Sequence, residues 1–166
     1  MYYLILVALL LLSGRSHAQG WGGGGGGGGG PGSPAMNTIR KLIRNRRNIA
    51  RRRPVNHTTG VSTFTKGNTT QVTNWIYQHV TEMMALRTSG GRIRNWDGLF
   101  RTMFEHSDDM DLECRKARGG VVCNNTGTTE CAIDLAQAHA QVVSRFLKYG
   151  QAEVRKDHSD YVSIKC

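Results

Sequence analysis

Nine consecutive glycines, Gly22 to Gly30, limit where this chain of 166 residues can fold. Glycine loses more conformational entropy on ordering than any other residue, and it has no side chain to bury. The run is therefore typical of a flexible, disordered spacer, which we place over residues 19–35. Any packed domain is expected to follow it.

The residues before the spacer have the pattern of a secretory signal peptide. Leu4 to Leu12 is an apolar run, and Ser16-His17-Ala18 supplies the small residues of a cleavage site. The run is well short of the ~20 apolar residues that a membrane-spanning helix needs. We predict a signal peptide over residues 1–18, a secreted, extracellular protein and no membrane span.

The cysteines and the glycosylation motifs agree with an oxidising compartment. Four cysteines predict two disulfide bonds, with three possible pairings, and their spacing is not that of a zinc site. Three Asn-x-Ser/Thr motifs predict a glycoprotein. The cysteines are Cys114, Cys123, Cys131 and Cys166, and the motif asparagines are Asn56, Asn68 and Asn124.

Helical patterns dominate the last hundred residues. Apolar residues recur at helical spacing over 69–88, 96–106 and 129–149. Gly119-Gly120 lies between two short strand-like runs and predicts a hairpin. We expect a mainly α fold over residues 68–166: a small three-helix domain with a short β-hairpin, stapled by two disulfides.

The excess positive charge is concentrated in residues 36–54. The formal net charge is +10, although the chain from Val55 onward carries thirteen basic and twelve acidic residues. Eight like charges repel one another, so we predict a basic arm that is unstructured alone and helical on an anionic surface, joined by a linker over 55–67. The cations of the arm are Arg40, Lys41, Arg44, Arg46, Arg47, Arg51, Arg52 and Arg53.

The basic arm supports three interpretations. A cationic arm suits anionic extracellular polymers or matrix surfaces, a mineralised matrix included, with salt-dependent affinity. Alternatively, Arg44-Asn45-Arg46-Arg47 matches the Arg-x-Lys/Arg-Arg pattern of proprotein cleavage, which would release the helical domain as a signalling ligand for a receptor. The third interpretation is a host-defence protein whose arm disrupts membranes. We favour polyanion binding over processing, and rank host defence third.

Catalytic and metal-binding signatures are weak. No GxSxG, HExxH or GxxxxGK motif occurs. Asp157-His158 could pair a base with its orienter, but no nucleophile is implied. His79 and His139 fall on apolar helix faces and could meet, although buried, hydrogen-bonded histidines are commoner than metal ligands. An EF-hand that starts at Asp109 fails at two of its required positions. We predict no enzyme, no cofactor and no metal, and no family is identified.

Overall fold

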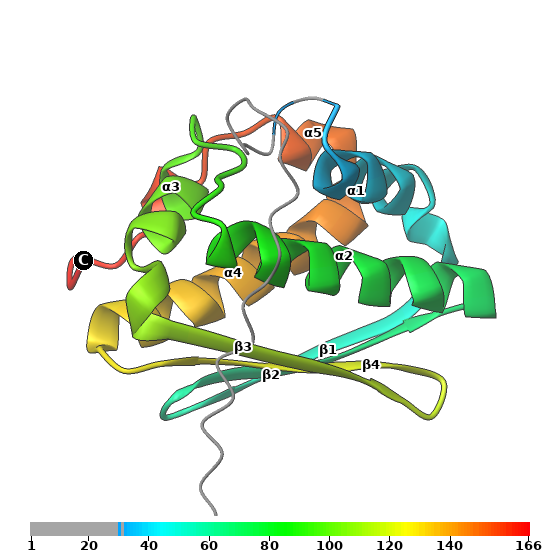
Figure 1. Ribbon diagram of the computed structural model, residues 1–166, viewed down its shortest axis with the longest axis horizontal. Helices are drawn as coiled ribbons and strands as arrows, with labels where there is room; N and C mark the ends of the chain where they lie inside the picture. The colour runs from blue at the N-terminus through cyan, green and yellow to red at the C-terminus, as the bar shows by residue number, and fades with distance from the viewer. Residues whose placement is uncertain (1–29, 31) are drawn as a thin grey trace, which may run out of the picture.

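A four-stranded antiparallel sheet with helices on one face forms the protein (Figure 1). The computed structural model describes residue 30 and residues 32–166, so the predicted signal peptide and residues 19–29 and 31 of the predicted spacer lie outside the described residues. The strand order is β1-β2-β4-β3. The strands are β1 (Ile49–His57), β2 (Gly60–Gly67), β3 (Met110–Ala117) and β4 (Gly120–Gly127).

The helices lie above one face of the sheet, and no helix of the described residues covers the opposite face (Figure 1). Three short 3-10 turns, Arg46–Asn48 (η1), Ser107–Asp109 (η2) and Ser159–Tyr161 (η3), connect the elements. None of the helices in the described part of the chain is long and apolar enough to span a bilayer. The helices are α1 (Pro34–Arg44), α2 (Thr70–Thr88), α3 (Gly98–Glu105), α4 (Glu130–Tyr149) and α5 (Gln151–Val154).

The expected fold class is wrong, because the basic segment and the linker are parts of the fold. Residues 34–44 form α1, and residues 49–67 form the hairpin of β1 and β2. This hairpin pairs through β2 with β4, so the expected short hairpin becomes half of a four-stranded sheet. The segment Val61-Ser-Thr-Phe-Thr65 is β-branched and aromatic, which suits a strand better than a linker.

Strand β1 accommodates its arginines because it is an edge strand. Side chains alternate between the two faces of a strand, so like charges at neighbouring positions point in opposite directions. Pro54, which has no N–H to donate, is tolerated at an edge, and charged side chains there oppose pairing with other chains. The basic residues are therefore spread over the surfaces of a folded domain.

The fold contains two copies of one unit, 60 positions apart in the chain. Gly60 and Gly67 bound β2 as Gly120 and Gly127 bound β4, and a long helix follows each strand. Thr69 Oγ1 accepts a hydrogen bond from Val72 N, and Thr129 Oγ1 accepts one from Ala132 N, each at 3.2 Å. These matching N-caps start α2 and α4. The two units meet where Thr63 of β2 lies opposite Cys123 of β4.

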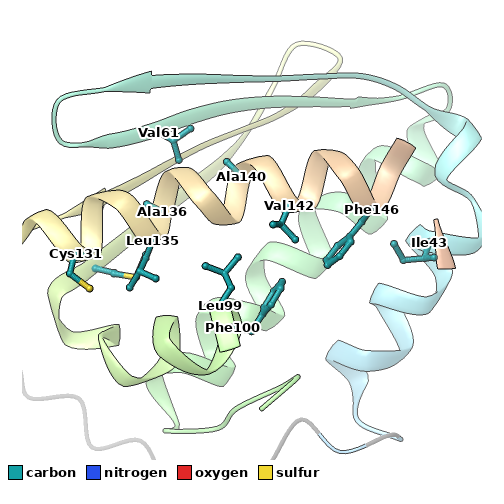
Figure 2. Close-up of a cluster of buried hydrophobic side chains, with 12 residues drawn as sticks. Ile43, Val61, Leu99, Phe100, Cys131, Leu135, Ala136, Ala140, Val142 and Phe146 are labelled. Carbon is teal, nitrogen blue, oxygen red and sulfur yellow. The ribbon is translucent and has the colours of Figure 1, made fainter. Parts of the chain in front are cut away.

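Helix α4 runs through the centre of the hydrophobic core (Figure 2). Leu135 of α4 and Leu99 of α3 are both fully buried. Helix α1 contributes Leu42 and Ile43 to the core, and Ile43 packs in the same cluster as Phe146 of α4. Helix α1 is thus anchored by apolar contacts to the rest of the domain.

Two disulfides form, as expected, and the structure decides their pairing. Cys114–Cys123 joins directly opposite residues of β3 and β4, and Cys131–Cys166 ties the chain end to the first turn of α4. A buried polar cluster holds the same C-terminal segment: Asp97 Oδ2 accepts from Arg94 Nη2 at 2.6 Å and from His158 Nδ1 at 2.8 Å. The segment after α5 is therefore fixed to α3 and α4.

Candidate functional site

A cavity of about 260 Å³ lies between the helix-covered face of the sheet and the helices above it. Most of its wall is apolar, and side chains of both repeated units contribute. Val61 and Val121, which hold equivalent positions in β2 and β4, form part of its floor. The helices supply, among others, Ile76, Val80 and Met83 from α2, Met103 from α3 and Ala136 and Val143 from α4.

Arg52 of β1 brings a positive charge to this apolar wall. It lies opposite Thr65 of β2, and the pleat directs both side chains toward the helices. Its Nη1 donates to Thr65 Oγ1 at 3.1 Å, its Nε to Ser144 Oγ at 3.2 Å and its Nη2 to the Ala140 carbonyl at 3.3 Å. All three partners are neutral. Burial lowers the pKa of Arg52 to about 10.

His79 and His139 line the same cavity from equivalent positions of α2 and α4. Burial, together with the positive charge of Arg52, lowers the pKa of His79 to about 4 and that of His139 to about 3. The carboxylate of Glu82 acts in the opposite direction on the pKa of His79. Both imidazoles are therefore neutral at pH 7. The Nδ1 atom of His79 is buried and has no hydrogen-bond partner in residues 32–166.

The expectation that the two histidines could meet is thus correct to the extent that they share one cavity. The described residues contain no cluster of three or more side chains suited to a metal ion.

The Asp157-His158 pair is not formed as a base and its orienter. His158 donates to Asp97 instead, and Asp157 accepts from the backbone of Gly98 at 2.7 Å. These bonds hold the C-terminal segment in place.

The uncovered face of the sheet carries a second feature, a row of side chains that crosses all four strands. Arg53 of β1 lies opposite Phe64 of β2, Phe64 lies opposite Val122 of β4, and Val122 lies opposite Arg115 of β3. Their neighbours on the strands, Arg52 and Cys123, line the cavity, so these four side chains point to the other face. Arg51 and Lys66 form the next pair whose side chains point to this face. We call the whole set the basic sheet face: Arg51, Arg53, Phe64, Lys66, Arg115 and Val122.

The eight predicted cations are distributed over four environments. Arg51 and Arg53 are exposed on the basic sheet face, and Arg52 lines the cavity. Arg46 is half-buried, with its guanidinium against Gly150, which ends α4, where the helix dipole favours a positive charge. The remaining four, Arg40, Lys41, Arg44 and Arg47, lie on α1 and η1.

The three motif asparagines are exposed, as an N-glycosylation site must be. Asn68 lies directly before the helix cap, and Thr69 rather than Asn68 caps α2. Asn56 donates to Gln137 Oε1 at 3.2 Å near one end of the sheet. Asn124 accepts from Ser62 Oγ at 2.8 Å on the uncovered face, in the register row next to Phe64 and Val122. A glycan on Asn124 would therefore lie beside the basic sheet face.

Comparisons with protein families, with curated proteins and with solved structures found no match to this chain. The candidate sites rest on the geometry of the molecule alone. Sequence reasoning missed the cavity and the special place of Arg52, although a signal for the repeat was present. Gly60, Gly67 and His79 recur 60 positions later as Gly120, Gly127 and His139.

Proposed function

We propose that the protein is a secreted, non-enzymatic glycoprotein that binds anionic extracellular polymers, matrix polyanions included, through its basic sheet face. The observation that carries the proposal is the register of the sheet. It places Arg51, Arg53, Lys66 and Arg115 around two apolar side chains on a face that no described helix covers. Four like charges gathered on one face attract a polyanion over a distance of about a Debye length.

The spacing of the cations suits a linear polymer that crosses the strands. Arg53 and Arg115 stand on the two edge strands, three strand spacings apart, which corresponds to about 14 Å. Phe64 and Val122 fill the distance between them and offer an apolar contact to the body of the polymer. A chain laid across the sheet would meet a cation at each edge.

Acidic and basic residues lie toward opposite ends of the uncovered face. Glu113 lies opposite Asn124, and Asp111 lies opposite Thr126, both toward the other end of the uncovered face. None of the salt bridges between described residues uses Arg51, Arg53, Lys66 or Arg115. The positive charge at this end is available to an external anion.

The structure gives no support to the two other interpretations of the basic segment. Cleavage after Arg47 would leave α1 attached through Leu42 and Ile43, which are buried in the core, so the helical part would not be released cleanly. Membrane disruption by α1 would need the same apolar side chains, and these already contact the domain. We therefore retain polyanion binding as the proposed function.

Two variants with equal loss of charge test the proposal on a heparin column. The sheet variant changes Arg51, Arg53, Lys66 and Arg115 to Gln, and the helix variant changes Arg40, Lys41, Arg44 and Arg47 to Gln. The logarithm of the affinity for a polyanion falls linearly with the logarithm of the salt concentration, with a slope of roughly one per contacted charge. We expect the sheet variant to lower this salt slope by about 3 to 4 and the helix variant to change it much less. Equal retention of the sheet variant and the natural protein would overturn the proposal.

A further inference from the structure

We propose that the cavity binds an amphipathic organic anion, a medium-chain fatty carboxylate, with its head group on Arg52 and its chain between the sheet and helices α2 and α4. This site is separate from the basic sheet face, because it lies on the opposite side of the sheet. The two proposals rest on different residues and can fail independently.

The charge of Arg52 selects an anion. A guanidinium has five N–H groups in a fixed fork. Three atoms of Arg52 donate to Ser144, Thr65 and the Ala140 carbonyl, and two N–H groups remain. No carboxylate within residues 32–166 forms a salt bridge with Arg52. A partly buried cation among neutral partners loses hydration, and a carboxylate that accepts the remaining N–H groups would offset that cost.

The two histidines supply neutral hydrogen-bonding groups near this charge. Arg52, His79 and His139 line one cavity, and the positive charge of Arg52 lowers the pKa of both rings. A neutral imidazole has one N–H donor and one acceptor. The buried Nδ1 of His79, which lacks a partner in the described chain, can donate to a carboxylate oxygen in the tautomer that protonates this nitrogen. Two further arginines line the cavity: Arg94, which is paired with Asp97, and Arg87 in the last turn of α2, but the charge that acts on both imidazoles is that of Arg52.

The shape and lining of the cavity select the rest of the ligand. Its volume of about 260 Å³ is at the small end for ligand pockets, which favours a short chain over a long one. Val61, Val121, Ile76 and Val80 provide aliphatic walls. Met83 and Met103 also line the cavity, and their flexible side chains can adjust to an irregular apolar chain.

Binding is tested with the full mature protein, using decanoate and decanol as probes in calorimetric titrations at pH 7.5. The two probes share one apolar chain and differ in charge. We expect decanoate to bind at least tenfold more tightly than decanol. Equal affinities would overturn the role of Arg52, even if no variant of this residue folds. Absence of decanoate binding would overturn the proposal as a whole.

Matched variants locate the head group and the chain. Arg52→Gln should weaken decanoate binding at least tenfold and leave decanol binding unchanged. Arg53→Gln removes the same charge one position along β1, on the outer face, and should change neither affinity. Val143→Phe fills part of the cavity and should weaken both probes. An Arg52→Gln protein that binds decanoate as the natural protein does would refute the head-group assignment. Heparin retention should survive Arg52→Gln.

Discussion

Acidification should destabilise the fold through His79 and His139. Burial lowers the pKa of these groups to about 4 and about 3, whereas a histidine in an unfolded chain has a pKa near 6.5. Between these values the unfolded chain binds protons that the folded chain does not. The free energy of unfolding therefore rises with pH, and the stabilisation present above pH 6.5 is lost progressively as the pH falls toward the folded-state values.

The size of the loss follows from the two pKa differences. A pH of 5.0 is about 1.5 units below the pKa of a histidine in the unfolded chain. At this pH His79 and His139 are still mostly neutral in the folded protein. Each pH unit corresponds to about 1.4 kcal/mol, so each histidine loses about 2 kcal/mol between pH 7.5 and pH 5.0. Together they lose about 4 kcal/mol, a large share of the 5–15 kcal/mol typical of a domain.

Urea unfolding at the two pH values measures this effect, with the fluorescence of the three tryptophans as the probe. The double variant His79→Gln and His139→Gln cannot protonate at these positions. We expect the natural protein to lose about 4 kcal/mol more than the double variant on going from pH 7.5 to pH 5.0, and each single variant to show about half of the difference. Equal losses in the natural protein and the double variant would refute the assignment of both histidines to a buried, neutral state.

Two further predictions concern stability and use the same assay. Removing the Cys131–Cys166 disulfide by Cys→Ala changes should cost about 4 kcal/mol and removing Cys114–Cys123 about 3 kcal/mol, because the first closes the longer loop; the reverse order would contradict loop entropy as the main term. Gly127→Ala should cost about 1 to 3 kcal/mol, because the added Cβ would lie 2.5 Å from the backbone nitrogen of Ile133, whereas Gly32→Ala, with nothing within 4 Å, should be neutral. An unchanged midpoint for Gly127→Ala would contradict the tight turn from β4 into α4.

The helices were predictable because their signal is local. The apolar spacing over 69–88 and 129–149 reproduces α2 and α4 to within one residue. The sheet was not, because its pairing joins β2 to β4 across a long stretch of chain. The threonines of β2 appear polar in isolation, and they become part of a sheet only when β4 lies beside them. The 60-residue recurrence of glycine and histidine, together with the β-branched and aromatic segment from Val61 to Thr65, could have shown the second hairpin.

The candidate sites were likewise predictable only in part: their residues could be identified from the sequence, but their arrangement in space could not. Arg51, Arg52 and Arg53 are indistinguishable as consecutive cations in a sequence. The pleat of β1 sends Arg52 into an apolar cavity and its two neighbours onto the opposite face, and pairing with Thr65 decides which residue points inward. His79 and His139 were visible as residues on apolar helix faces. Their shared cavity depends on how α2 and α4 pack on the sheet.

The sequence by itself determined the two long helices, the number of disulfides and the segment that holds the excess charge. These properties depend on residue type and on spacing within a few turns of chain. Only the tertiary structure decided the sheet, the disulfide pairing and the separation of one basic segment into a cation that lines the cavity and cations on the opposite face of the sheet. The physical reason is that burial and electrostatic environment are set by neighbours that are distant in sequence. A side chain acquires them only when strands pair and helices pack.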